Sequence, residues 1–553
     1  MTARHTAGRR LVDTLVLLAI VAGSNLTTSG PLHPLAAPSG GPFVDTVLVD
    51  TARVIRVIPP DFFGINYVGF WDDDQGSAAS ARALAQTPIR VLRFPGGIPG
   101  DWYDWADPYY KGQSRTSPLD LWTYARKIGA RPLFQTNYQG HLPNPPGRSY
   151  AVNSPQNAAA WVTYDMTAGI PAVMEVGNEE DVTMKTADDS RFQPYVDAFN
   201  AQARAMHRAN PGVKVYGPAG TNEWYWWGLD SLGMFLRGAG NKTGSGQVDG
   251  VSLHFYKGSS WADSMSVAQY WLSPSGPWAA IQRSIAAHDT RHLPVRLTEW
   301  NLGSTSFNNQ FTPTLGHALA IADLLGAFAQ SGLDGEDYFD LHGASGWGLL
   351  YGTGENRPAD SPTPTYYTMA LWSHMGNRVL PLVQSEDAAK VMSSYATRAG
   401  DGSYQVLAIN KQPTAETVRV QLNGATPAGH HLRVYTLGPA AGSVFDHDAR
   451  YNGLTMPSPR RPLPGPRQLG VVKGNTISYS VPGYTAVVLS LDGASPAPRT
   501  TQAITPHQSR AVAPAPTLTI TAAGAVASRT VARGGHESLS SIRCPSTGRS
   551  GSC

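Results

Sequence analysis

The amino-acid sequence predicts an α/β protein in which a (β/α)8 TIM barrel is followed by a C-terminal antiparallel β-sandwich. Its 553 residues allow two or three domains. Eight short apolar runs between residues 62 and 343 read as strands, and helical stretches separate them. From residue 376 to 492 the pattern changes to short alternating strands, which is typical of a sandwich.

Strands that alternate with helices indicate a parallel sheet. One helix begins at Ser117-Pro118, with Asp120 in its first turn, and ends at Gly129. A second helix, 195–209, ends before Asn210-Pro211-Gly212. A doubly wound open sheet is the alternative, but no G-x-G-x-x-G motif follows the first strand. The predicted barrel strands are 62–68, 89–96, 131–138, 172–179, 214–219, 249–256, 294–301 and 337–343.

The N-terminus has the pattern of an export signal. Arg4, Arg9 and Arg10 precede the apolar run 11–23, and small residues follow it. The run is short for a membrane span, so a cleaved signal peptide is preferred over an uncleaved anchor. We therefore expect a secreted, extracellular protein that keeps no stable membrane span after cleavage.

Composition then sets the other boundaries. The predicted segments are a signal peptide (1–24), a linker (25–42), N-terminal strands that join the sandwich (43–61), the catalytic barrel (62–375), the sandwich (376–492) and a disordered low-complexity tail (493–553). The only cysteines, Cys544 and Cys553, lie in that tail, so no disulfide framework or thiolate metal site is expected in the body.

Several classes of partner and chemistry are disfavoured. The net charge of +3 gives no indication of a nucleic-acid surface. Neither H-E-x-x-H nor G-x-S-x-G occurs, and we predict no cofactor and no metal. The acidic run Asp72-Asp73-Asp74 could in principle bind a cation, but a solvated loop is the preferred interpretation.

Two glutamates at strand ends predict a reaction. Glu179 ends the fourth predicted strand and Glu299 lies near the end of the seventh. In a (β/α)8 barrel both would point into the mouth, where active sites lie. Two carboxyl groups that face each other across a sugar are what glycoside hydrolysis requires, so we expect a carbohydrate substrate.

The other acids of the stretch "EVGNEED" receive different interpretations. Glu175 shares a face with Glu179 but lies deeper, where packed side chains fill a barrel. We interpret it as an internal, satisfied carboxylate. Glu180 and Asp181 lie beyond the strand and are interpreted as loop or helix-capping acids.

Other polar residues at strand ends are candidates for substrate binding. His254 and Tyr256 share a face of the sixth strand, where they could orient a carboxylate and contact the sugar. Arg93 could pair with an internal acid such as Glu175 or contact the sugar. Gly96 and Gly97 allow a tight turn toward a ligand.

Amides and aromatic rings complete the candidate set. Asn66, Asn137 and Asn178 lie at predicted rims, where amides suit hydroxyl recognition, although loop asparagines are common. Aromatic clusters at 101–105, 223–228 and 346–351, the last with Trp347, could wall a sugar site or pack in the core.

The sequence resembles a clan A retaining glycoside hydrolase, and its nearest likeness is to glycoside hydrolase family 51, the α-L-arabinofuranosidases. The likeness runs through 62–380 in "LRFPGG", "YARKIGARP", "AAAWVTYD", "EVGNEED", "RAMHRANPGVKV", "VDGVSLHFY" and "LTEWN". It implies Glu179 as general acid/base and Glu299 as nucleophile. It also implies Asn178 as a contact to the 2-hydroxyl, Tyr256 as a partner of the nucleophile, and a sandwich packed on the barrel.

Two loops depart from the family pattern. Ile98-Pro-Gly-Asp follows the glycine pair, and "LHGASGWGLL" replaces the family's usual segment after the eighth strand. Both loops shape the sugar site, so a β-glucuronidase (heparanase-like) or xylosidase activity stays open, as does a non-catalytic carbohydrate-binding role. Linkage, exo or endo action and oligomeric state are not predicted. Retention would place the two carboxyls about 5–5.5 Å apart.

Overall fold

A computed structural model describes residues 43–492, except 70–71, 73–76, 109–115, 143–147, 184–189, 222–229, 304–310, 344–345 and 385–389. The predicted signal peptide, linker and low-complexity tail lie outside the described residues. Among the helices that are described, none combines the length and the apolar character that crossing a membrane requires.

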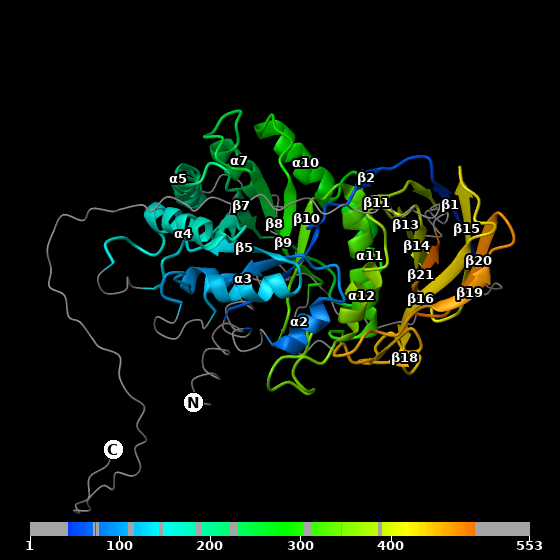
Figure 1. The fold of residues 1–553 in the computed structure, drawn as a ribbon. Helices are drawn as coiled ribbons and strands as arrows, with labels where there is room; N and C mark the ends of the chain where they lie inside the picture. The colour runs from blue at the N-terminus through cyan, green and yellow to red at the C-terminus, as the bar shows by residue number, and fades with distance from the viewer. Residues whose placement is uncertain are drawn as a thin grey trace, which may run out of the picture. The chain divides into compact units, whose positions relative to one another are not determined.

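A closed barrel of eight parallel strands forms the first part of the fold (Figure 1). Each strand pairs with the next one in the chain, and the last pairs with the first, so the TIM barrel is confirmed and the open sheet is wrong. The strands are β3 (Phe63–Asn66), β4 (Val91–Phe94), β5 (Arg131–Thr136), β6 (Val173–Val176), β7 (Val215–Gly220), β8 (Gly250–Tyr256), β9 (Val295–Asn301) and β10 (Gly335–Tyr338).

The last barrel strand differs from its predicted range of 337–343. After Tyr338 the chain folds back on itself: Leu349 N–H donates to Asp340 O at 3.0 Å, and Leu350 N–H donates to Leu341 O at 2.9 Å. Residues 340–341 and 349–350 therefore lie side by side as in a hairpin, and the chain does not extend β10.

Helices lie between the barrel strands and around the barrel (Figure 1). The predicted capping of the helix at 118 is present, because Asp120 N–H donates to Ser117 Oγ and Ser117 N–H donates to Asp120 Oδ2. The helices are α2 (Ala78–Leu84), α3 (Pro118–Lys127), α4 (Pro155–Ala168), α5 (Gln193–Ala209), α7 (Ser231–Ala239), α8 (Trp261–Ser264), α9 (Val267–Leu272), α10 (Pro277–His288), α11 (Leu315–Ser331) and α12 (Pro364–Trp372), with 3-10 turns η1 (Ile98–Trp102), η3 (Glu180–Thr183) and η4 (Ser190–Phe192).

Two sheets with mostly antiparallel strands form the C-terminal sandwich. Of the two N-terminal strands, β1 joins one sheet and β2 joins the other. One sheet has the order β12 (Leu382–Val383), β1 (Val44–Asp50), β15 (Glu416–Asn423) and β20 (Thr476–Val481). The other runs β18 (Leu454–Thr455), β17 (Ala449–Tyr451), β16 (His431–Pro439), β21 (Thr485–Leu491), β14 (Tyr404–Asn410), β13 (Met392–Arg398), β11 (Arg378–Val379) and β2 (Arg56–Val57), with β19 (Arg467–Val471) also paired to β16. The barrel is thus inserted between strands of the sandwich.

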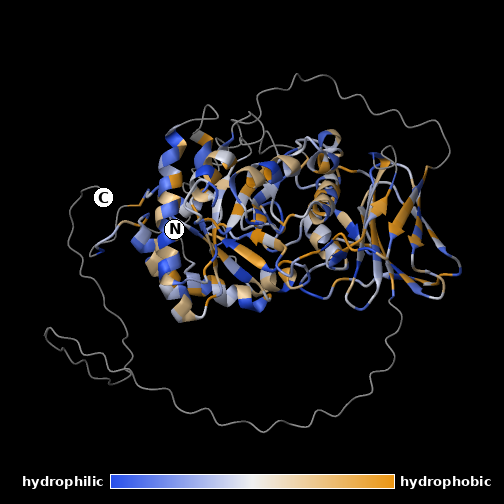
Figure 2. Ribbon diagram, turned by 90° about the horizontal axis from the view of Figure 1, so that it is seen from above, coloured by the Kyte–Doolittle hydropathy of each residue, from blue (hydrophilic) through white to orange (hydrophobic). Residues whose placement is uncertain are grey.

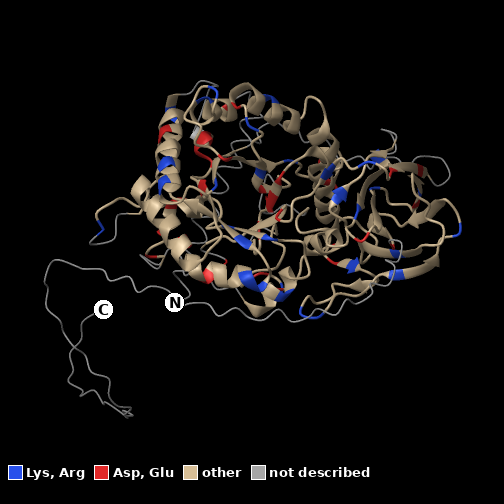
Figure 3. Ribbon diagram, turned by 45° about the horizontal axis from the view of Figure 1, so that its top comes forward, with Lys and Arg blue, Asp and Glu red and all other residues tan. Residues whose placement is uncertain are grey.

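Hydrophobic residues are frequent on the strands of both parts (Figure 2). One continuous core runs from the barrel through α11 and α12 into β14, β16 and β21, and a second lies between the two sheets of the sandwich. Charged residues occur on the barrel strands themselves as well as on the outer helices (Figure 3). Because a buried charge must be paired, the charged residues on the barrel strands indicate that ion pairs lie inside the barrel.

Polar contacts also join the barrel to the sandwich. Lys411 Nζ, just after β14, lies 2.7 Å from Asp323 Oδ2 of α11, and both side chains are buried. At the first turn of α11, Leu315 N–H donates to Asp446 O and Gly316 N–H donates to Val444 O. The loop after β16 thus satisfies N–H groups that a helix N-terminus leaves open.

Candidate active site

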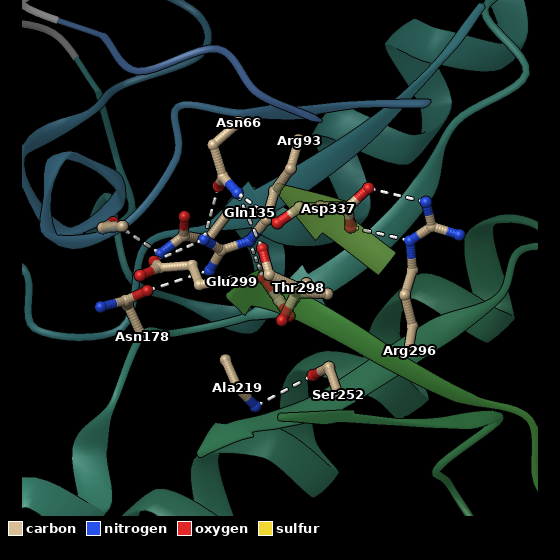
Figure 4. A network of polar contacts seen from close by, with 12 residues as sticks. Asn66, Arg93, Gln135, Asn178, Ala219, Ser252, Arg296, Thr298, Glu299 and Asp337 are labelled. Carbon is tan, nitrogen blue, oxygen red and sulfur yellow. Dashed lines mark hydrogen bonds and ion pairs between the residues drawn. The ribbon is translucent and has the colours of Figure 1, made fainter. Parts of the chain in front are cut away.

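Arg93 on β4 is the centre of a buried polar network at the strand ends (Figure 4). Its Nε donates to Glu175 Oε2, and its Nη1 donates to Glu299 Oε1, both at 2.7 Å. Nη1 also donates to Asn66 Oδ1 at 3.0 Å, and Nη2 donates to Asn178 Oδ1 at 2.9 Å. Burial disfavours the charged guanidinium, but Glu175 and Glu299 outweigh it and raise the pKa of Arg93. Arg93 therefore positions carboxyl groups, and it takes the predicted role of partner to Glu175.

A second buried ion pair lies next to this network (Figure 4). Arg296 Nη2 on β9 lies 2.6 Å from Asp337 Oδ1 on β10. Glycines make room for the pair, because a Cβ at Gly64 would lie 1.7 Å from Asp337 Oδ1 and one at Gly335 would lie 2.0 Å from Arg296 Nη1. Charged pairs thus occupy part of the barrel interior, where branched apolar side chains are usual.

Glu299 is held at both carboxylate oxygens. Oε1 accepts from Arg93, and Oε2 accepts from the hydroxyl of Tyr256 at 2.8 Å. Gly97 takes φ +73° beside it, and a Cβ there would lie 3.2 Å from Glu299 Oε1. Two charge-assisted hydrogen bonds therefore fix an ionised carboxylate, and glycine allows the backbone to approach it closely.

The surroundings of Glu179, unlike those of Glu299, favour the protonated carboxyl. It follows β6 with φ +56°, and its N–H donates to Ala219 O at 2.9 Å. Burial, together with the charge of Asp181, raises the pKa of Glu179 to about 8, although Arg93 acts in the other direction. The carboxyl of Glu179 therefore holds a proton at neutral pH, as a general acid must.

His254 links the two glutamates. Its Nδ1 lies 2.7 Å from Glu179 Oε1 and 3.6 Å from Glu299 Oε2. Burial lowers the pKa of His254 to about 4, so the ring is neutral. Its Nε2 is buried and has no partner among the described residues, and an unpaired acceptor costs less than an unpaired N–H. We therefore assign the proton to Nδ1, which donates to Glu179.

A β-bulge places His254 correctly. The pairing of β8 with β9 shifts between Leu253 and His254, and this shift brings His254 opposite Glu299. Bulges re-aim side chains in this way beside active sites. The sequence shows that His254 lies on the strand but not that the register changes there.

Glu179 and Glu299 approach each other closely across the mouth of the barrel. One ligand-type atom each of Glu179, His254 and Glu299 lies within 4.8 Å of the other two. Atoms this close are compatible with the carboxyl separation of about 5–5.5 Å that a retaining mechanism needs. The same atoms could coordinate a cation, but a cation would compete with Arg93 for Glu299. The arrangement suits proton transfer and nucleophilic attack.

The two acids that follow Glu179 make hydrogen bonds to loops and helices around the barrel. Glu180 is buried and accepts from Gln139 Nε2, and burial, with Asp101 nearby, raises the pKa of Glu180 to about 10. Asp181 accepts from Thr221 N–H at 2.9 Å and from Ser231 Oγ at 2.8 Å. Both acids are buried more deeply than the loop positions that we predicted for them.

Three predicted positions need correction. Asn66 Nδ2 donates to Thr298 O at 3.0 Å and to Asp337 O at 3.1 Å, so its amide is engaged inside the barrel and does not reach a sugar. Asn137 Nδ2 donates to Asp101 O, so it holds a loop. Asp72 is not solvated: its Oδ1 lies 2.7 Å from Nδ1 of buried His342. Asp73 and Asp74 lie outside the described residues.

Aromatic side chains wall one side of the two carboxyls. The rings of Tyr256 and Trp347 have centroids 5.7 Å apart, and Phe339 packs edge-on against Trp347 at 6.2 Å. Trp347 is buried, so it supports the wall from behind Tyr256. The cluster at 223–228 lies outside the described residues. Phe339 is a member that sequence reasoning missed, because it follows the end of β10.

The fold, a TIM barrel joined to a β-sandwich, is shared with glycoside hydrolases of known structure. The chain is similar to the α-L-arabinofuranosidase of Thermotoga maritima solved with arabinose (18% identity, TM-score 0.61) and to the family 51 α-L-arabinofuranosidase of Thermotoga petrophila (17%, 0.61). Each match covers 81% of this chain and all of the other. A family 44 xyloglucanase of Paenibacillus polymyxa matches 82% of this chain and all of its own at 12% identity (TM-score 0.59).

The predicted likeness to family 51 is thus confirmed at the level of the fold. No known family profile matches the sequence, and no characterised protein matches it by sequence.

Proposed function

We propose that this chain is a secreted retaining glycoside hydrolase that releases α-L-arabinofuranosyl residues from plant or microbial polysaccharide. The facing pair of Glu179 and Glu299 carries the proposal. Their oxygens lie within 4.8 Å, one carboxyl is held as an anion by Arg93 and Tyr256, and burial keeps the other protonated. Opposite protonation states in two adjacent carboxyls are what an acid and a nucleophile need.

The geometry supports a double displacement. Glu299 attacks the anomeric carbon while protonated Glu179 transfers its proton to the leaving oxygen. Glu179, now ionised, accepts a proton from water, which attacks the same carbon and releases the sugar and Glu299. His254 keeps Glu179 directed toward the bond through its Nδ1–H, and Asn178 remains the candidate contact to the 2-hydroxyl.

A neutral pentose is the favoured substrate. Arg93 is bound by two carboxylates and two amides, so it offers no guanidinium to a uronate carboxyl. The similar arabinofuranosidases support the furanoside. The second candidate is an endo-acting β-glycanase, which the similar xyloglucanase favours. Export rests on the N-terminal arginines and apolar run, and N-terminal sequencing of protein from culture medium tests it.

The experiment is hydrolysis of 4-nitrophenyl glycosides: α-L-arabinofuranoside, β-xyloside, β-glucuronide and β-glucoside. We expect release from the arabinofuranoside, and loss of at least about a thousandfold in Glu299→Gln. Asp197→Asn, which changes an exposed carboxylate on α5, should keep full activity. Proton NMR of the first product shows the anomer, and an inverted product would refute the mechanism. Activity on another glycoside alone would refute the substrate.

A further inference from the structure

Two aromatic rings from consecutive loops of the barrel mouth lie face to face. Trp102 ends η1 after β4, and His141 lies in the loop after β5. Their ring centroids are 4.6 Å apart and their planes are 31° apart. Trp102 is partly exposed and His141 is exposed. Within the described part of the chain, no residue hydrogen-bonds to either ring, so the indole N–H and the imidazole edge are open.

A nearby tryptophan shows the contrast. The indole N–H of Trp105 donates to Asn157 Oδ1 at 3.0 Å, and its ring stacks on buried Trp161. Trp105 therefore packs into the core between the loop and α4. The aromatic cluster at 101–105 thus divides into two members that pack in the core, Tyr103 and Trp105, and one that is presented at the surface, Trp102.

Asp101 holds the two rings in place. Its Oδ1 accepts from the N–H groups of Tyr138 and Gln139 at 3.1 and 3.0 Å. Its carbonyl accepts from Asn137 Nδ2 at 2.9 Å and from His141 N–H at 3.3 Å. These bonds tie the loop after β4 to the loop after β5, so the pair is fixed before any ligand binds, which lowers the entropic cost of binding.

The pair lies close to the proposed nucleophile. Gly97, which precedes η1, would carry a Cβ 3.2 Å from Glu299 Oε1, and its carbonyl accepts from Gln135 Nε2 at 2.9 Å. A 3-10 turn rises about 2 Å per residue, so the backbone of Trp102 lies within about 10 Å of Gly97. The rings are thus within reach of a sugar unit that neighbours the one at Glu299.

We propose that Trp102 and His141 form a stacking platform for a second sugar ring, beside the one whose bond is cleaved. The ligand class is a pentose or hexose unit of a neutral oligosaccharide. The apolar face of the sugar stacks on the outward face of one ring, which the other ring supports from behind, and the sugar hydroxyls reach the open N–H edges. Partial burial of the His141 ring lowers its pKa, which favours a neutral platform at neutral pH.

The platform rests on the proposed glycosidase function, and two measurements test the two proposals separately. The first compares kcat/KM for an arabinoxylan oligosaccharide with that for 4-nitrophenyl arabinofuranoside. In Trp102→Ala the oligosaccharide value should fall at least about tenfold more than the aryl glycoside value, mainly through KM. His141→Ala should shift the ratio in the same direction, and Trp102→Phe should restore part of it. Trp122→Ala, which changes a partly exposed tryptophan on the outer helix α3, should not shift the ratio.

The second measurement needs no catalysis. Glu299→Gln and Glu299→Gln/Trp102→Ala are compared by affinity electrophoresis in gels that contain arabinoxylan, xylan or xyloglucan. Retardation of the first protein and free migration of the second support the platform even if the arabinofuranoside is not the substrate. The platform is overturned if Trp102→Ala leaves the ratio of the two kcat/KM values unchanged and the two Glu299→Gln proteins migrate equally. Absence of hydrolysis with retained binding overturns only the proposed function.

Discussion

Replacing Glu179 by Gln removes the proposed proton donor but keeps the size of the side chain and an acceptor for His254. With a pKa of about 8 in place of 4.5, roughly 90% of Glu179 side chains hold a proton at pH 7, against less than about 1% for an ordinary glutamate. General acid catalysis contributes about 100- to 10,000-fold. We expect kcat/KM to fall by that factor for an arabinofuranoside whose leaving group is a simple alcohol.

The assay compares two leaving groups. Dinitrophenolate leaves without a proton, so Glu179→Gln should lose far less kcat/KM on a dinitrophenyl arabinofuranoside than on the alcohol glycoside. For the unaltered protein, activity on the alcohol glycoside should fall as the pH rises through about 8, where Glu179 ionises. In the variant this basic limb should be gone. Equal losses on both substrates, or a basic limb that persists, would refute the assignment.

The remaining predictions concern stability and positioning. Because folding raises the pKa of Glu179 from 4.5 to about 8, this side chain ionises in the unfolded chain first, and the free energy of unfolding falls as the pH rises through this range. Glu179→Gln cannot ionise. It should therefore raise the free energy of unfolding at pH 7 by up to about 3 kcal/mol in urea titrations and leave it unchanged at pH 4. Tyr256→Phe removes one hydrogen bond of about 1.5–3 kcal/mol to the proposed nucleophile, so kcat/KM should fall about ten- to a hundredfold with no change in fold by circular dichroism. Arg93→Met leaves buried carboxylates unpaired and should cost about 3–5 kcal/mol in urea unfolding, which Arg93→Lys should not fully restore. Lys411→Met should cost a similar amount, and adding Asp323→Leu should recover most of it; additive losses would show that the pair is not coupled.

Much of the barrel could be predicted because its strands are local apolar runs separated by capped helices. The two glutamates could be predicted because strand ends of a parallel barrel meet at one mouth. Glu175 could be assigned to the interior from side-chain alternation alone, and the structure pairs it with Arg93. These inferences use only the pattern within each strand and the general geometry of a parallel barrel.

What was missed depends on register and on contacts between distant segments. The network around Arg93 needs the alignment of Asn66 beside it on β3, which no local pattern records. Asn66 therefore looked like a rim amide, although its donors are used inside the barrel. Asp72 looked like part of an acidic loop, because its partner His342 lies 270 residues further along the chain.

The position of β1 has a consequence for how the chain folds as it is made. Val44 pairs with Thr417, which is 373 residues further on, so β1 emerges from the ribosome long before its partner β15 exists. At about 5–20 residues per second, an apolar strand waits roughly 20–75 s for its neighbour. During this time the complete barrel can form, while β1 presents open backbone groups to any other strand nearby. Completion of the sandwich is therefore one of the last folding events, and the step most exposed to aggregation.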